Sequence, residues 1–98
     1  MKIHQTRTGN ELVIALEERL DTMTAPELEA VLKTALNGVE SLVFDFSKLD
    51  YISSAGLRVL LSSQKVMNRQ GSMKVTHVNE TIMEVFEVTG FSDILTIE

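Results

Sequence analysis

The first half of the chain contains two short apolar runs, followed by a segment whose apolar residues have helical spacing. Residues 3–7 and 12–16 are predicted to be strands, because Thr8-Gly9-Asn10 between them is typical of a tight turn. After Thr24, apolar side chains recur at spacings of three and four, which predicts a helix with Thr24 as its N-cap and Asn37-Gly38 at its end. The stripe consists of Leu28, Val31, Leu32, Ala35 and Leu36.

The second half repeats a strand followed by a helix. Residues 41–46 form a nearly continuous apolar run, typical of a strand that is central in a sheet. A helix-like stripe follows and stops near Gln70-Gly71, and residues 73–78 predict a fourth strand with Met73, Val75 and His77 on one face. Asn79 is placed to cap a third helix, which Gly90 ends.

Strands separated by helices predict right-handed crossovers, and therefore a mostly parallel sheet after an opening antiparallel hairpin. Residues 92–97 fit either a short helical turn or a last extended segment, so we expect four to five strands. Residues 1–98 are expected to form a single α/β domain, because a chain of 98 residues leaves little room for two cores.

Composition excludes several classes of protein. Apolar residues make up 44% of the chain and charged residues 23%, which is ordinary for a globular domain. No apolar run approaches the roughly 20 residues that cross a bilayer, and no export signal marks the start, so we expect a cytoplasmic protein. The chain has no cysteine, which excludes disulfides, thiolate metal sites and cysteine nucleophiles.

The net charge of −5, with Lys and Arg scattered along the chain, argues against nucleic-acid binding. That binding depends largely on Lys and Arg that neutralise phosphates. An acidic surface is better suited to a protein partner with a basic face.

The strongest chemical signal lies between residues 41–46 and the following helix. Ser53, Ser54 and Gly56 fall at this junction, where the first N–H groups of the helix lack partners and its dipole favours an anion. From the residues alone, either serine can be an N-cap worth about 1 kcal/mol, or a site where phosphate is added and removed. Gly56 can equally serve close helix–sheet packing or the access of a kinase to Ser54.

The segment Ser53-Ser54-Ala55-Gly56-Leu57, after the lead-in Leu49-Asp50-Tyr51-Ile52, resembles the switch loop of STAS domains. The match is to the stand-alone anti-sigma factor antagonists of bacteria, whose typical loop reads Asp-Ser-Ser/Thr-Gly-Leu and is phosphorylated on its first serine. By this resemblance Ser54 takes the phosphoacceptor position. Ser53 stands in place of the acid, and Ala55 in place of the second hydroxyl residue.

Two further segments resemble the same family. Residues 19–25 are similar to its Gly-x-Leu-Asp-x-x-Thr-Ala segment between the second strand and the first helix. Residues 85–91 are similar to its aromatic-containing third helix and the turn that ends it. The resemblance covers essentially the whole chain and implies a STAS-type α/β domain whose helices pack mainly on one face of a mixed sheet.

The resemblance implies a regulatory protein that is not an enzyme and needs no cofactor or metal. The unphosphorylated form would bind an anti-sigma factor that is a serine kinase, and so free a sigma factor. The kinase would phosphorylate Ser54, and a separate serine phosphatase would restore it. We expect no membrane insertion, no direct nucleic-acid contact, and a monomer or weak dimer. The expected partner-binding residues are Asp21, Thr22, Met23, Thr24, Ser53, Ser54, Ala55, Gly56, Leu57 and Arg58.

Two other functions stay open. A STAS subunit of a membrane lipid-transport complex would use the same loop as an unmodified interaction surface. A nucleotide-binding or small enzymatic α/β domain has less support, because His4 and His77 stand in no catalytic or metal-ligand spacing. Asp45 is expected to emerge beside the switch loop. It is a poor candidate for a receiver-like phospho-aspartate, because His4-Gln5 offers no acidic pair for magnesium.

Overall fold

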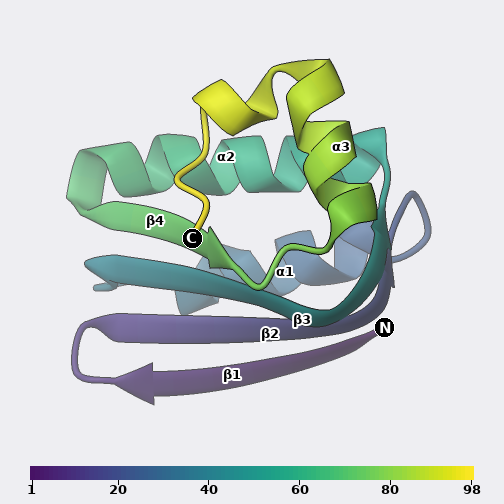
Figure 1. Cartoon of the computed structure of the whole chain (residues 1–98). Coiled ribbons are helices and arrows are strands. Elements are labelled where there is room, and N and C mark those ends of the chain that lie inside the picture. Colours follow the sequence, from purple (N-terminus) through teal and green to yellow (C-terminus); the bar gives the residue numbers. More distant parts are fainter.

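A four-stranded sheet organises the molecule. In the computed structural model, which describes residues 1–98, the strands are β1 (Lys2–Thr8), β2 (Glu11–Leu20), β3 (Ser41–Ile52) and β4 (Ser72–Thr76), in that spatial order (Figure 1). β1 pairs with β2 antiparallel, whereas the β2–β3 and β3–β4 pairs are parallel. The opening hairpin and the mixed sheet predicted from the sequence are therefore confirmed.

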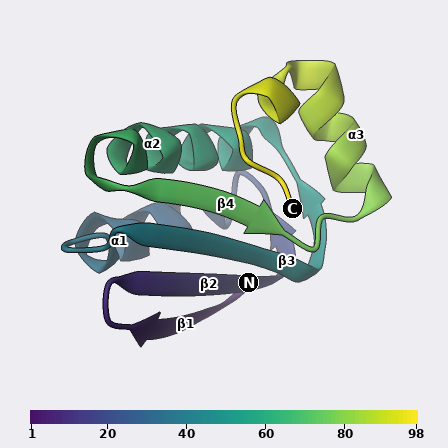
Figure 2. The same cartoon turned by 60° about the vertical axis from the view of Figure 1, so that its left-hand side comes forward.

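Two long helices cover the same face of the sheet. α1 (Ala25–Ala35) connects β2 to β3, and α2 (Ser54–Gln70) connects β3 to β4; they lie side by side in Figures 1 and 2. Two successive crossovers of one hand, moving in one direction across a sheet, place both helices on one face. α3 (Glu80–Thr89) stands beside the end of β3 and leads into the 3₁₀ turn η1 (Phe91–Asp93). None of these helices is both long and apolar enough to cross a bilayer.

One core fills the space between the sheet and the helices. Alternate residues of β2 and β3 point toward the helices and are almost fully buried, as expected for strands with one covered face. Ile82 and Phe86 of α3 belong to the same core. The buried strand residues on this face include Leu12, Ile14, Leu16, Leu42, Phe44 and Phe46.

β2 and β3 both extend beyond their predicted ends at residues 16 and 46. Two register shifts interrupt the ladder between them, and Glu18, at the second shift, has a left-handed backbone with φ 76°. Such bulges break the alternation of apolar and polar residues, so the continuation is hidden in the sequence. As a result, Leu20 and Ile52 pair with each other as the last residues of their strands. The loops after β2 and β3 therefore start at the same edge of the sheet.

The third helix has the ends that the sequence predicted. Asn79 Oδ1 accepts a hydrogen bond of 2.8 Å from the Ile82 N–H, and Asn79 Nδ2 donates to the Leu49 carbonyl at 3.0 Å. Gly90, with φ 82°, ends the helix in the left-handed region that glycine favours. The bond to Leu49 fixes the start of α3 to β3.

The segment after α3 contains both predicted alternatives, first a short helical turn and then an extended end. η1 is a short helical turn, and Ile97 then forms a parallel bridge with Val75 at the edge of β4. The Val75 N–H donates to the Thr96 carbonyl, and the Glu98 N–H donates to the Val75 carbonyl, each at 2.9 Å.

Two expectations about the strand ends are wrong. β4 ends at Thr76, and His77 leaves it with φ 57° and an exposed side chain, so it does not continue the face of Val75. Asp45 lies in the middle of β3 rather than beside the switch loop, because β3 continues to Ile52. Its carboxylate Oδ1 instead accepts from the Ser47 N–H at 2.9 Å and lies 3.2 Å from His77 Nδ1.

Candidate functional site

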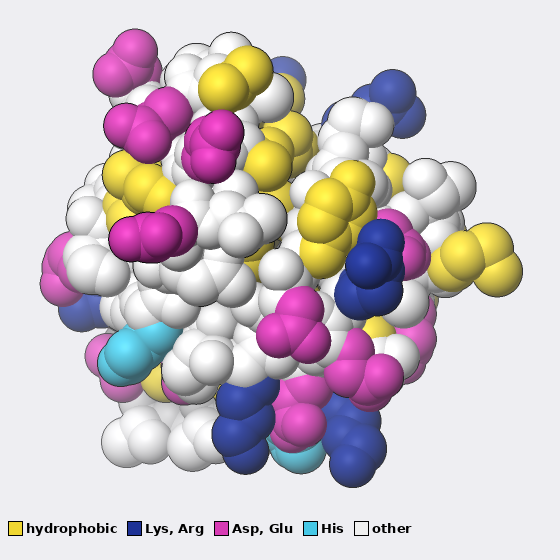
Figure 3. Space-filling view, turned by 45° about the vertical axis from the view of Figure 1, so that its right-hand side comes forward, with side chains coloured by type: hydrophobic (Ala, Val, Ile, Leu, Met, Phe, Trp, Pro, Cys, Tyr) yellow, Lys and Arg dark blue, Asp and Glu magenta, His cyan; other side chains and the backbone are white.

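Ser53 and Ser54 differ in exposure at the start of α2. Both loops at this edge of the sheet lie on the right of Figure 1, the side that Figure 3 brings forward. The Ser53 N–H donates to the Leu20 carbonyl at 2.9 Å, and the Ser53 hydroxyl is buried without a hydrogen-bond partner. Ser54 is the first residue of α2 and is exposed. The tie to β2 therefore directs the Ser53 hydroxyl inward and leaves that of Ser54 accessible.

The first turn of α2 retains a positive end. Ser53 occupies the N-cap position, but its side chain accepts no hydrogen bond from the helix. The Leu57 N–H is the first that bonds back, to the Ser53 carbonyl at 3.0 Å. The first turn also contains no acidic residue. N–H groups and a dipole that no carboxylate compensates favour a negative group at this point.

The loop between β2 and α1 is held by Asp21 rather than by the predicted cap Thr24. Asp21 Oδ1 accepts from the Met23 N–H at 3.0 Å and from the Thr24 N–H at 3.2 Å. The Thr24 hydroxyl makes no capping bond; it donates to the Arg19 carbonyl at 2.8 Å and accepts from the Asp21 N–H at 2.9 Å. The prediction of Thr24 as the N-cap is therefore wrong for its side chain, because the turn offers the hydroxyl closer partners.

The ionised form of Asp21 stabilises this loop. Partial burial alone would raise the pKa of the Asp21 carboxyl, but hydrogen bonds from Thr24, Arg19 and Met23 outweigh it and hold the pKa below its usual value. Arg19 Nε lies 3.3 Å from Asp21 Oδ2, and its guanidinium carbon lies 4.4 Å from the centre of the Tyr51 ring. The Arg19 side chain thus connects this loop to the segment that leads into Ser53.

Replacement of Asp21 by Ala is expected to lower the melting temperature by a few degrees at neutral pH, because two N–H groups lose their acceptor. The folded pKa of Asp21 is depressed, so its contribution is complete above the unfolded pKa, near 4, and is lost as the pH falls through the folded value. The difference between parent and Asp21→Ala should therefore shrink in acid. Thermal melts of both proteins from pH 7 to pH 2 measure it, and a constant difference would contradict the charged role.

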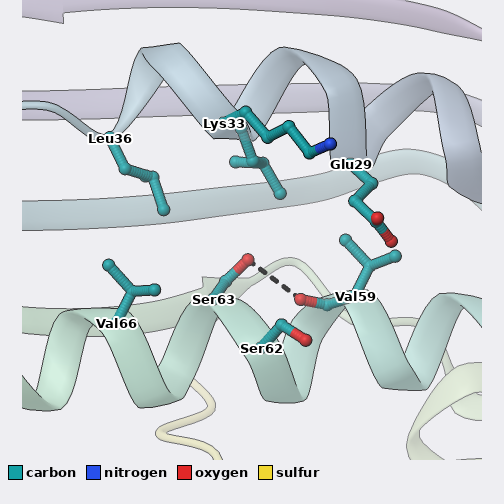
Figure 4. Close-up of a pocket in the computed structure, with 8 residues that line it drawn as sticks. Glu29, Lys33, Leu36, Val59, Ser62, Ser63 and Val66 are labelled. Atoms are coloured by element: carbon teal, nitrogen blue, oxygen red, sulfur yellow. Dashed lines mark hydrogen bonds between the residues drawn. The ribbon is translucent and has the colours of Figure 1, made fainter.

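A shallow groove between α1 and α2 begins at these two loops. Its first part has a volume of about 410 Å³ and is bordered by Thr22, Ala55 and Arg58. It shares Glu29, Val59 and Ser62 with a second hollow farther along the same helices. In Figure 4, Leu36, the residue after α1, and Val66 of α2 point toward each other across this second part. The Ser63 hydroxyl donates to the carbonyl of Val59 in its own helix.

Comparison with known families agrees with this geometry. Residues 3–96 match the family model described as "Mlab, STAS domain". The chain belongs to the STAS domain family. The fold and family predicted from the switch loop are thereby confirmed.

Several relatives of this STAS domain have names that state a role. A relative in Bordetella bronchiseptica, named "Putative anti-sigma factor antagonist BtrV", is 34% identical over 99% of this chain and 85% of its own length. Two solved structures of SpoIIAA share the fold at 20% identity. The unphosphorylated form covers 99% of this chain and 87% of its own with a TM-score of 0.78. The phosphorylated form, from Bacillus, covers 99% and 91% with a TM-score of 0.77.

The STAS fold gathers most of the predicted partner-binding residues at one edge, but not all of them at the surface. Met23 is 86% exposed, and Thr22, Ser54 and Arg58 are exposed too, whereas Asp21, Thr24, Ser53 and Ala55 are half-buried. Gly56 and Leu57 are buried and therefore support the site by packing. In this conformation they offer no surface to a partner.

Sequence reasoning missed the groove that continues from the switch loop. Val59 and Ser62 follow Ala55 at spacings of four and seven, so they lie on the same face of α2. That spacing was the available signal. The spacing does not show where α1 lies, and α1 forms the opposite wall of the groove.

The histidines are part of a different surface of this STAS domain. His4 Nε2 lies 2.6 Å from Glu17 Oε2, and this hydrogen bond lowers the pKa of the Glu17 carboxyl. His77 contacts Asp45 on β3. Neither histidine forms a hydrogen bond with Ser54, and no three His, Asp or Glu side chains converge as a metal site would require.

Proposed function

We propose that this STAS domain is an anti-sigma factor antagonist controlled by phosphorylation of Ser54. In its unphosphorylated form it binds an anti-sigma factor and so releases a sigma factor for transcription. The observation that carries the proposal is the exposed Ser54 hydroxyl on the first turn of α2, at an edge shared with the exposed β2–α1 loop. The name of the Bordetella relative, which matches nearly the whole chain, supports it.

The switch is electrostatic and local. A phosphate on Ser54 adds about −1.5 to −2 charges and three acceptor oxygens. The uncompensated N–H groups of α2 tolerate this charge, and Arg58, one helical turn farther on, is placed to neutralise part of it. The domain therefore stays folded. A partner seated on the loop must desolvate or repel the charge, and a loss of a few kcal/mol is enough to release it.

The partners follow from this cycle. The anti-sigma factor is a serine kinase that modifies Ser54 while bound, and a separate serine phosphatase restores the hydroxyl. The antagonist itself performs no chemistry, needs no cofactor, and acts in the cytoplasm as a monomer or weak dimer. Met23, exposed and flexible, supplies an adaptable apolar contact beside the serine.

The test measures the intact mass of the protein after incubation with the kinase, and its ability to displace the sigma factor. The purified protein is incubated with ATP and the serine-kinase anti-sigma factor of the same genome, and its intact mass is recorded. We expect one added phosphate, absent from Ser54→Ala and retained in the matched control Ser53→Ala. The parent should also displace the sigma factor from that kinase. Phosphate transfer to Ser53, or no displacement at any concentration, would contradict the proposal.

A second candidate is favoured by the departures from the family's typical loop. Ser53 replaces the usual acid and Ala55 the second hydroxyl residue. Without the acid, Ser54 is less well positioned for a kinase. This fits a STAS subunit of a membrane lipid-transport complex, in which the loop is an interaction surface and Ser54 is never modified. In that case the protein would copurify with a membrane transporter, and Ser54→Ala would leave the association unchanged.

A further inference from the structure

The exposed side of α3 carries an apolar surface that no other element covers. Val88 is 82% exposed, and Val85, one turn earlier, is half-buried beside it. α3 reaches the core through other residues, so Val88 has no packing role within the domain. We refer to the residues that line this shallow hollow of about 370 Å³ as the α3 surface: Thr81, Glu84, Val85, Val88 and Thr89.

The segment that contains α3 is acidic. Lys74 is the last basic residue of the chain. Residues 1–74 carry nine basic and nine acidic side chains, which balance, so the whole net charge of −5 comes from residues 75–98. Figure 3 shows acidic side chains beside hydrophobic ones in its upper left part, over α3. The acidic residues of this segment are Glu80, Glu84, Glu87, Asp93 and Glu98. Glu98 lies 3.5 Å from Lys74 Nζ, whereas the other four form no salt bridge.

The apolar and acidic character of the α3 surface together indicate which class of partner it can bind. Nucleic acids and anionic membranes are repelled by an acidic surface, because both recruit Lys and Arg. A second copy of the chain would bring its own acidic α3 against this one, which like-charge repulsion disfavours. A protein segment with apolar side chains flanked by Lys or Arg satisfies both features of the surface.

We propose that the α3 surface docks a basic amphipathic segment of a partner protein. Its apolar side chains lie over Val85 and Val88, and its Lys or Arg side chains lie beside Glu84 and Glu87. The acidic field accelerates association, and the binding weakens as salt screens it. The site goes beyond the Ser54 switch and does not depend on it, although α3 is tied to β3, which leads to Ser54.

The test is an NMR titration of the full-length ¹⁵N-labelled protein. The probe is a synthetic helical peptide with Leu on one face and Lys on the other; the control peptide has Glu in place of every Lys. We expect the Lys peptide to shift amide signals of the α3 surface and to bind at least about tenfold more weakly when the salt is raised from 50 to 500 mM. Equal binding of the Glu peptide, or shifts centred elsewhere, would overturn the proposal.

Variants test whether peptide binding depends on the α3 surface itself, rather than on the overall acidity of the protein or on Ser54. The double change Glu84→Lys/Glu87→Lys should abolish the shifts, whereas Glu27→Lys/Glu29→Lys on α1, with the same change of net charge, should preserve them. Val88→Ser should weaken binding without changing the charge. Equal losses in both double variants would contradict a specific surface. Ser54→Asp should titrate like the parent, so failure of the Ser54 mechanism and failure of this site give different results.

Discussion

The Ser54→Asp variant is expected to bind the anti-sigma factor at least about tenfold more weakly than the parent, a loss of about 1.4 kcal/mol or more. Its melting temperature should stay within a few degrees. The exposed position at the start of α2 is the reason for both results. The helix end accommodates a carboxylate, as it favours anions, but an interface that covers Ser54 must desolvate it. Calorimetric titration and thermal melts measure the two quantities.

Two controls distinguish this mechanism from a general effect of charge. Ser54→Ala should bind like the parent and escape regulation. Asn68→Asp adds the same charge to an exposed position near the other end of α2 and keeps the Oδ1 atom that accepts from Gln64. It should leave binding unchanged. If Ser54→Asp binds as tightly as the parent, or if Asn68→Asp weakens binding equally, the local electrostatic mechanism is wrong.

The Gly56→Ala variant is expected to unfold at a temperature about 5 to 20 °C lower than the parent. A Cβ atom at Gly56 would lie 2.7 Å from Leu20 Cγ, 2.8 Å from Ile52 Cγ1 and 3.0 Å from the Leu20 carbonyl oxygen. Those side chains are fully buried at the strand ends, and the carbonyl accepts from the Ser53 N–H. Overpacking of this kind costs about 1–3 kcal/mol, and each kcal/mol shifts the melting temperature of such a domain by roughly 4–8 °C.

A lower unfolding temperature for Gly56→Ala would be informative, because Gly to Ala at an open helix position would stabilise the helix by about 1 kcal/mol. The matched test is a double-mutant cycle with Leu20→Ala, which removes the nearest contact. The two changes should be less harmful together than the sum of their separate effects. Additive effects, or a Gly56→Ala protein as stable as the parent, would show that close packing does not require this glycine. Kinase access to Ser54 would then remain as its role.

Local sequence signals predicted the helices and their ends well. Asn79 and Gly90 bound α3 as expected, because a side-chain acceptor and a left-handed residue act within one helical turn. The switch segment could also be recognised, because its resemblance to the STAS loop rests on the short run Ser53-Ser54-Ala55-Gly56-Leu57. These features depend on residues that are neighbours in the sequence.

The strand ends could not be predicted in the same way. The bulges near Glu18 shift the register, so Leu20 and Ile52 continue a core that seemed to end several residues earlier. The same extension moved Asp45 away from the switch loop and into the middle of β3. A strand continues where a partner satisfies its N–H and C=O groups, and the partner lies far away in the sequence.

By itself, the sequence determined the kinds of element, their order, and the presence of a serine at the start of a helix. The tertiary structure decided which serine is accessible, because the Ser53 N–H bonds to Leu20 and turns its own hydroxyl inward. It also decided that Asp21, rather than Thr24, holds the neighbouring loop. Local preferences offer each polar group several partners, and only the packed chain determines which partner is within reach.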